Sequence, residues 1–296
     1  MRSGFVSLVG RPNVGKSTLL NSIIGKKIAI TSNKPQTTRN IIQGIYNDDD
    51  SQIIFVDTPG IHKPTHKLGK ILNRQAYYSI DDVDIILFLA DVSVKLGTGD
   101  KYVIDKLKEI DKPVILVLNK IDTIKKEEIL LKIDEYKNLF DFKEIVPVSA
   151  LNNNNVNRLI EVIKKYLPDQ VKYYEDNKQV TNKLIDFLIA EIIREKVFML
   201  TDEEVPHSTT CIVESIELGK TSNTINASII VDRDSLKKII IGRLGSKIKE
   251  IGSLARVEIE ELMGKKIYLD LFVKTVKKWR DKDKYLSEFG YNDFEK

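Results

Sequence analysis

Residues 10–17 read Gly-Arg-Pro-Asn-Val-Gly-Lys-Ser, and this stretch decides the fold of the first part of the chain. It follows an apolar run, Phe5–Val9, which predicts a buried strand, and it precedes a helical pattern that begins at Ser17. Glycines at both ends let backbone N–H groups turn inward around phosphate oxygens, and the helix start adds the positive end of its dipole. The order of strand, loop and helix therefore predicts a phosphate-binding loop.

The side chains of this loop have separate expected roles. Lys16 should reach the outer phosphates of a nucleotide, and the Ser17 hydroxyl should bind magnesium. The residues of this segment that we expect to contact the nucleotide are Gly10, Arg11, Pro12, Asn13, Val14, Gly15, Lys16, Ser17 and Thr18.

Apolar runs and helical patterns alternate along the first part of the chain. Runs typical of buried parallel strands are Phe5–Gly10, Ile53–Asp57, Ile85–Asp91, Val114–Asn119 and Ile145–Ser149. Helical spacing occurs at Ser17–Ile24, Leu68–Ser79, Lys101–Ile110, Glu127–Phe140 and Val156–Tyr166. This alternation predicts an α/β domain with a doubly wound, mostly parallel sheet, in which ligands bind at the carboxyl ends of the strands.

Two further segments are expected to complete a magnesium and phosphate site. Residues 57–60, Asp-Thr-Pro-Gly, end a strand, so the carboxylate can hold the magnesium shell and the Gly60 N–H can meet the terminal phosphate. Residues 35–39 read Pro-Gln-Thr-Thr-Arg, and a threonine hydroxyl there can close the shell while that phosphate is bound; an ordinary polar loop is the alternative. We expect Ser17, Thr38 and Asp57 as metal ligands, with Thr58 and Pro59 beside the nucleotide.

Residues 119–122, Asn-Lys-Ile-Asp, follow another strand and are expected to select the base. The two acceptor oxygens of Asp122 match the N1–H and N2–H donors of guanine, whereas adenine presents an acceptor at N1 and no amino group. Each lost charge-assisted hydrogen bond costs roughly 1.5–3 kcal/mol, so adenine should be rejected. The expected base contacts are Asn119, Lys120 and Asp122, with the backbone of Ser149, Ala150 and Leu151. The predicted ligands are therefore GTP or GDP with Mg²⁺.

A polar stretch near residue 170 predicts a domain boundary. We place a nucleotide-binding domain at 1–169, a linker at 170–180 and a second domain at 181–296. The expected order in the second domain is a helix at Asn182–Lys196, two strands joined near Gly219–Asn223, two short helices flanking a glycine pair, and a strand at Lys266–Val273. This order predicts a small α+β domain.

The glycine pair lies in residues 242–245, Gly-Arg-Leu-Gly. Alone, such a turn is explained by helix capping. The flanking element order, together with five basic and no acidic residues between 237 and 249, favours a clamp for an RNA backbone. The residues expected to bind RNA are Ile241, Gly242, Arg243, Leu244, Gly245, Ser246, Lys247 and Lys249.

These motifs in this order resemble the Era group of GTPases, in which one GTPase domain is joined to a KH domain. The resemblance covers essentially the whole chain, and residues 35–39, 251–256 and 276–280 carry its more specific marks. It implies GTP hydrolysis and binding of single-stranded RNA, not DNA, at the 3′ end of small-subunit (16S) rRNA, in small ribosomal subunit biogenesis. In KH domains the position of Leu244 often carries Lys or Gly, which shifts the expected phosphate grip toward Arg243 and Lys247.

The resemblance also bears on catalysis. Relatives use an asparagine at the position of Asn13 to hold a potassium ion beside the phosphates, although the side chain can instead brace the loop. Many small GTPases orient the attacking water with a glutamine after the Asp-x-x-Gly motif, and here Ile61 occupies that position, so slow intrinsic turnover is expected. The expected catalytic residues are Asn13, Lys16, Thr38 and Gly60.

Composition limits the remaining functions. The 296 residues are 42% hydrophobic and 30% charged, and the net charge is only +4. The most apolar stretch, Ile85–Ala90, is far shorter than the roughly 20 residues that span a bilayer. We expect a cytoplasmic monomer, with possible contact to the inner face of the cell membrane through the lysine-rich residues 265–284. The alternative function is a GTPase whose C-terminal domain is a protein-interaction or membrane-surface module.

Overall fold

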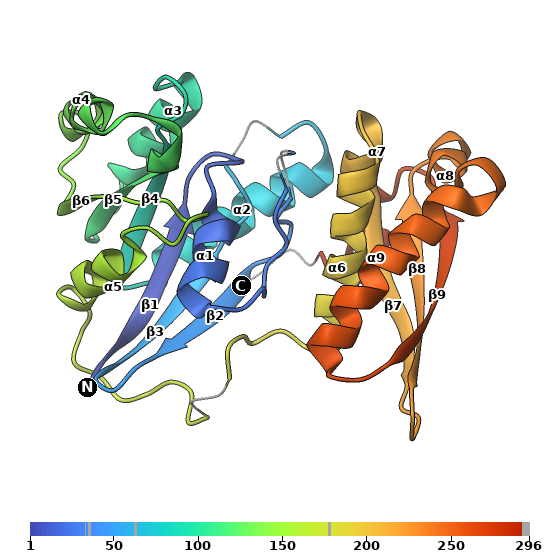
Figure 1. Cartoon of the computed structure of the whole chain (residues 1–296). Coiled ribbons are helices and arrows are strands. Elements are labelled where there is room, and N and C mark those ends of the chain that lie inside the picture. The colour runs from blue at the N-terminus through green and yellow to red at the C-terminus, as the bar shows by residue number, and fades with distance from the viewer. Residues whose placement is uncertain (33, 35–36, 62–63, 177–178, 292–296) are drawn as a thin grey trace. The chain divides into compact units, whose positions relative to one another are not determined.

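A six-stranded sheet in the order β2-β3-β1-β4-β5-β6 forms the centre of the first part of the chain (Figure 1). The computed structural model describes residues 1–32, 34, 37–61, 64–176 and 179–291, so Pro35 and Gln36 of the predicted threonine loop lie outside the described residues. The chain forms two compact units, one of residues 1–64 and 72–182 and one of residues 65–71 and 183–296.

The strands of the first unit are β1 Arg2–Val9, β2 Ile42–Asn47, β3 Ser51–Asp57, β4 Ile85–Asp91, β5 Val114–Asn119 and β6 Glu144–Pro147. All neighbouring strands are parallel except β2, which pairs antiparallel with β3. The five strands predicted from apolar runs are therefore present, and the mostly parallel doubly wound sheet is confirmed. The edge strand β2 was not predicted.

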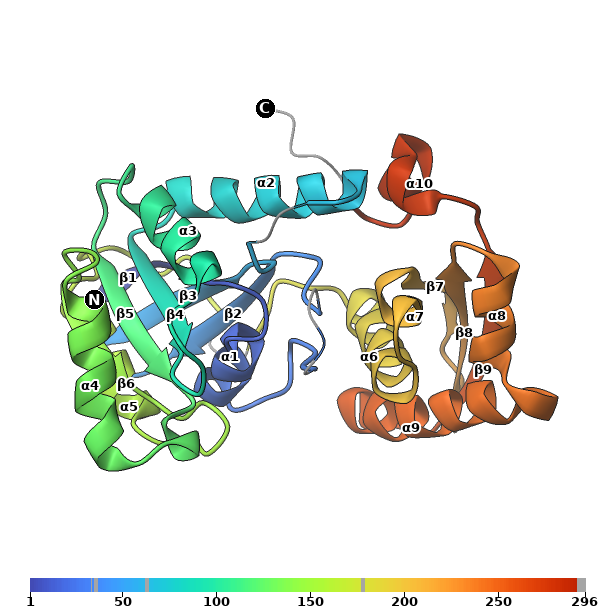
Figure 2. The same cartoon turned by 90° about the horizontal axis from the view of Figure 1, so that it is seen from above.

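The helices of the first unit are α1 Lys16–Ile24, α3 Thr98–Leu107, α4 Lys126–Lys137, α5 Val156–Lys164 and, from residue 72 onward, α2 Lys67–Asp81. Figure 2 shows α2 and α3 on one face of the sheet and α1 on the other. Buried side chains of α2, α3 and α4 share one apolar core with alternate residues of the central strands. Strands β3, β4 and β5 are buried along their whole length, as expected for parallel strands covered on both faces.

The segment after residue 169 was predicted as a polar linker, and in the structure it is bound along the edge of the first unit. The side chain of Gln52, which is fully buried in β3, accepts the N–H groups of Tyr173 and Tyr174 at 2.7 and 3.0 Å and donates to Tyr174 O at 2.9 Å. Ile45 N–H on β2 donates to Val180 O at 3.0 Å. The backbone of this segment therefore covers the free edge of β2.

The second unit is a three-stranded sheet in the order β7-β8-β9 with helices packed on one face. Its elements are α6 Ile185–Leu200, α7 Glu204–His207, β7 Thr209–Glu217, β8 Asn223–Val231, α8 Asp234–Ile241, α9 Ser246–Met263, β9 Ile267–Thr275 and α10 Asp283–Glu288. The strand β8 is antiparallel to β7 and parallel to β9. The predicted α+β order is confirmed, but one of the two helices predicted to be short, α9, has 18 residues.

The end of the second unit is fixed by an aromatic cluster. Trp279 is fully buried, its indole N–H donates to Ser208 O at 3.0 Å, and its ring lies 5.8 and 5.9 Å from the rings of Phe289 and Tyr291. These contacts show Trp279 as a packing residue. Among the described residues, we find no helix with the length and apolar character needed to cross a membrane.

Candidate functional site

The predicted phosphate-binding loop connects β1 to α1, so it lies at the carboxyl end of the sheet. Gly15 has a φ of +96°, and a Cβ added there would lie 2.3 Å from Asn119 Nδ2. That amide donates to Val14 O at 2.8 Å, while Asn119 Oδ1 accepts the Ala150 N–H at 3.0 Å. The buried Asn119 side chain therefore joins three of the predicted motifs, and only glycine fits at position 15.

Lys16 is the buried cation of this loop. Its Nζ donates to Gly10 O at 3.1 Å and to Arg11 O at 3.2 Å. Burial lowers the pKa of Lys16 to about 8, the charge of Arg11 adds to this lowering, and Asp57 opposes it. A phosphate oxygen is a stronger acceptor than a carbonyl oxygen and would favour the charged amine. The geometry therefore suits a lysine that turns toward phosphate.

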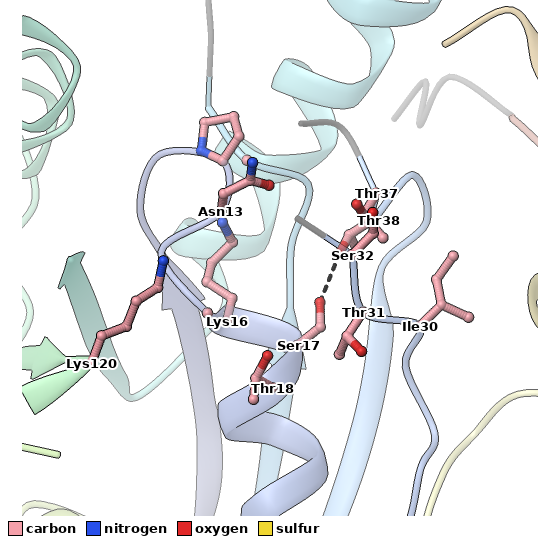
Figure 3. Close-up of a pocket in the computed structure, with 13 residues that line it drawn as sticks. Asn13, Lys16, Ser17, Thr18, Ile30, Thr31, Ser32, Thr37, Thr38 and Lys120 are labelled. Atoms are coloured by element: carbon pink, nitrogen blue, oxygen red, sulfur yellow. Dashed lines mark hydrogen bonds between the residues drawn. The ribbon is translucent and has the colours of Figure 1, made fainter. Parts of the chain in front are cut away.

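The three predicted metal ligands lie together. The Ser17 hydroxyl donates to Asp57 Oδ2 at 2.6 Å and lies 2.8 Å from Thr38 Oγ1, which is 3.5 Å from the same carboxylate oxygen. Figure 3 shows Ser17 and Thr38 pointing toward each other. Two hydroxyls and one carboxylate are hard oxygen donors of the kind that Mg²⁺ prefers beside nucleotide phosphates, so these residues fit the predicted ion.

Burial also controls the charge of this cluster. Asp57 is fully buried, and burial raises its pKa to about 6, against the opposing effects of Lys16 and the hydrogen bonds from Ser17 and Thr38. A magnesium ion requires the ionised carboxylate. Metal binding and protonation should therefore compete at Asp57 in mildly acidic solution.

The residues after Asp57 approach the phosphate-binding loop closely. A Cβ added to Gly60 would lie 2.8 Å from both the N and Cα atoms of Pro12. The Thr58 hydroxyl donates to Leu8 O at 2.8 Å, which ties this segment to β1. Ile61 is buried in the apolar core of the first unit.

The loop predicted to select the base is held by an ion pair and hydrogen bonds. Lys120 Nζ lies 2.6 Å from Asp91 Oδ2, and the Ser149 hydroxyl donates to the Asp122 carboxylate. Because the Ala150 N–H already donates to Asn119, the contact of residues 149–151 with the guanine oxygen stays a prediction.

A cavity of about 370 Å³ joins the phosphate-binding loop to the threonine loop and to Lys120 (Figure 3). The sequence analysis missed Ile30, Thr31 and Ser32, which line it from the segment after α1. Asn21 on α1 holds this segment, since its side chain accepts the Ala29 N–H at 3.0 Å and donates to Ala29 O at 2.7 Å. The only signal in the sequence is the position of this segment, beyond the carboxyl edge of the sheet.

In the second unit, the predicted RNA clamp is a turn between α8 and α9. Gly242 has a φ of +72°, and a Cβ there would lie 2.9 Å from Lys247 N, so a side chain is excluded. Leu244 has a φ of +53° and is 99% exposed, which leaves the tip of the turn open to a ligand. Lys247 Nζ instead donates to Leu200 O at 2.9 Å, at the end of α6. The predicted phosphate grip therefore rests more on Arg243 than on Lys247.

A groove of about 280 Å³ lies between α9 and β9. Its lining is Ile248, Lys249, Gly252, Ser253 and Arg256 from the helix and Tyr268, Leu269 and Leu271 from the strand. Of these, only Lys249 was a predicted site residue. The helical spacing of residues 249, 252, 253 and 256 places them on one face, which is the signal that identifies them. The groove combines an apolar floor with basic side chains.

Comparison with known proteins covers both units. The family model for 50S ribosome-binding GTPases matches residues 5–120, and the model for KH domains matches residues 204–280. A crystal structure of Era in complex with MgGDPNP and nucleotides 1506–1542 of 16S ribosomal RNA is 42% identical in sequence, with a TM-score of 0.95 over 98% of this chain and 99% of that chain. A variant of Aquifex aeolicus Era bound to GDP·AlF₄⁻ matches with the same identity, coverage and TM-score. This chain belongs to the Era family of GTPases.

Proposed function

We propose that this protein is a GTP-dependent switch that binds single-stranded RNA from the 3′ end of small-subunit ribosomal RNA during assembly of that subunit. The observation that carries the proposal is the groove between α9 and β9, beside the exposed turn at residues 242–245. Its apolar residues suit unstacked bases, and Lys249 and Arg256 offer charge to phosphates. The relative crystallised with nucleotides 1506–1542 of 16S rRNA supports this choice of RNA.

Hydrolysis of GTP depends mainly on positioning and charge, because phosphoryl transfer needs little covalent help from the protein. Lys16 would balance charge on the outer phosphates, and the Gly60 N–H would meet the terminal phosphate. Ser17, Thr38 and Asp57 would hold a magnesium ion, which would supply further positive charge to the phosphate oxygens. Since Ile61 is buried, no side chain at that position orients the water, and intrinsic hydrolysis should be slow.

The switch would act through residues whose contacts depend on the terminal phosphate. Thr38 and Gly60 lie in separate loops, one before β2 and one after β3, and each is expected to contact the terminal phosphate or its magnesium ion. Loss of that phosphate removes both contacts together. The conformation of these loops would therefore report the nucleotide state.

The RNA proposal is tested by fluorescence anisotropy with a labelled RNA of the 16S 3′-end sequence. The double variant Lys249→Ala/Arg256→Ala should bind at least about tenfold more weakly, because single base or phosphate contacts contribute about 1–3 kcal/mol. Lys274→Ala is the matched control, since that amine pairs with Glu214 on β7. The double variant and the control should both bind guanine nucleotide with the wild-type affinity. Equal RNA affinity of the double variant and the wild type would exclude the groove as the RNA site.

A membrane-surface role for the second unit is the alternative, and the basic residues between 265 and 284 are the observation that favours it. Retention on anionic phosphatidylserine vesicles at physiological salt, without binding of the RNA, would replace the first proposal with this one. We also propose that the protein is a cytoplasmic monomer that contacts the small ribosomal subunit. Cell fractionation, analytical ultracentrifugation and co-sedimentation with ribosomal subunits test these three statements.

A further inference from the structure

Asp100 is a fully buried acid outside every nucleotide motif of the first unit. It lies in the first turn of α3, and each of its carboxylate oxygens has a separate partner. Oδ2 accepts the Gly97 N–H at 3.2 Å, which caps the start of the helix. Oδ1 accepts Arg11 Nε at 3.0 Å. One carboxylate therefore connects the start of α3 to the phosphate-binding loop.

Arg11 connects this carboxylate to the phosphate-binding lysine. Its backbone carbonyl accepts Lys16 Nζ at 3.2 Å, and its charge lies close enough to lower the pKa of that lysine, in the same direction as the larger effect of burial. The aliphatic part of the Arg11 side chain lies over the start of α3, since a Cβ added to Gly99 would lie 3.5 Å from Arg11 Cδ. The side chain is only 26% exposed. The Arg11 side chain is thus held between the loop and the helix.

We propose that Asp100 is a positioning residue for the nucleotide, which acts by holding Arg11 and thereby the conformation of the phosphate-binding loop. A buried acid that has lost its cationic partner is strongly unfavourable, so the pair resists separation. When the pair is intact, the carbonyls and N–H groups around Lys16 keep one arrangement. When it is broken, the loop has more freedom and bound nucleotide should leave faster. Residues at the start of α3 thereby influence nucleotide release without touching the nucleotide.

The inference rests on GTP and GDP binding and is tested by the dissociation rate of a fluorescent guanine nucleotide, mantGDP, chased with excess GDP and Mg²⁺ in a stopped-flow instrument. Asp100→Asn and Arg11→Ala should each release mantGDP at least about tenfold faster, as expected for loss of a charge-assisted hydrogen bond. Asp105→Asn, on the same helix, is the matched control. Its carboxylate is 67% exposed and pairs with Lys108, so the dissociation rate should stay within twofold of the wild type.

A double variant separates the pair from independent effects. If Asp100 acts through Arg11, Arg11→Ala/Asp100→Asn should release mantGDP no faster than the more affected single variant, because the interaction is lost only once. Additive effects on the rate would overturn the proposal. So would rates within twofold of the wild type for both single variants.

Structural damage is distinguished by thermal unfolding of the same proteins with saturating GDP. Should Asp100→Asn fail to fold, Arg11→Lys decides the question, because lysine keeps the charge but lacks the Nε–H that Asp100 accepts. A folded Arg11→Lys protein with a wild-type release rate would exclude the proposal. Failure of wild-type protein to bind mantGDP would instead contradict the nucleotide site itself, so the two failures are separable.

Discussion

Replacing Asp57 by Asn should stabilise the first unit in the absence of nucleotide and metal, even though it removes a predicted magnesium ligand. Burial raises the pKa of Asp57 from 3.8 to about 6, so the ionised carboxylate is less favourable in the folded protein than in the unfolded chain. Asparagine removes this charge. It keeps a side-chain oxygen that accepts the hydrogen bond from Ser17, which limits the structural disturbance.

The size of the effect follows from the pKa shift of Asp57. A shift of about two pKa units corresponds to about 3 kcal/mol, at about 1.36 kcal/mol per unit. The penalty on the wild type is fully present above the folded pKa of about 6 and is lost as the pH falls from there toward 3.8, because the folded protein then holds a proton that the unfolded chain releases. The stabilisation by Asp57→Asn should therefore be up to about 3 kcal/mol at neutral pH and about half of that near pH 5.

Hydrogen–deuterium exchange of peptides from β1 and β3, in EDTA and without nucleotide, measures this free energy. The only tryptophan, Trp279, lies in the second unit, so its fluorescence does not report on the first. Asp91→Asn is the control of opposite sign. Burial acts to raise the pKa of Asp91, but hydrogen bonds from Lys120 and Ser93 outweigh it and hold this pKa below its usual value. That variant should be destabilised. The reasoning would be refuted if Asp57→Asn were less stable than the wild type, or if its gain in stability were the same at neutral pH and near pH 5.

Three other predictions concern the nucleotide. Asp122→Asn should lose GTP affinity by at least about tenfold and gain affinity for XTP, whose second oxygen accepts from the new amide; competition binding measures both. Wild-type single-turnover hydrolysis should be faster in potassium than in sodium, and Asn13→Ala should abolish the difference; equal wild-type rates in the two salts contradict the potassium assignment. Gly60→Ala should retain GDP but slow hydrolysis at least about tenfold, because its Cβ would lie 2.8 Å from Pro12; unchanged single-turnover rates would show that the loop moves aside.

The fold was predictable where residues repeat in a simple pattern. The buried parallel strands are continuous apolar runs, whereas β2 reads Ile-Gln-Gly-Ile-Tyr-Asn, in which an interior glycine and an imperfect alternation hide the strand. Helix α9 was predicted to be short, and it contains Gly252 and Ser253, two residues of low helix propensity. In the structure Gly252 lies beside Leu271, and a Cβ at position 252 would approach the end of that side chain to 3.3 Å, closer than an ordinary van der Waals contact. Tertiary packing overrides the local pattern in both cases.

Part of the candidate site was likewise predictable from the sequence, and part was not. The phosphate, magnesium and base motifs are contiguous stretches, and the structure brings Ser17, Thr38 and Asp57 together as expected. Contacts between distant segments were not predictable, because no local spacing connects them. The pairing of Arg11 with Asp100 and the β9 wall of the groove beside α9 are of this kind.

The docked segment after residue 169 decides where the first unit can be shortened. A fragment that ends at Asp169 loses the backbone partners of Gln52 and the carbonyl of Val180 that accepts from β2. An uncovered edge strand offers its hydrogen-bonding groups to other chains. Such a fragment should therefore self-associate through β2, whereas one that continues to Asn182 should remain monodisperse.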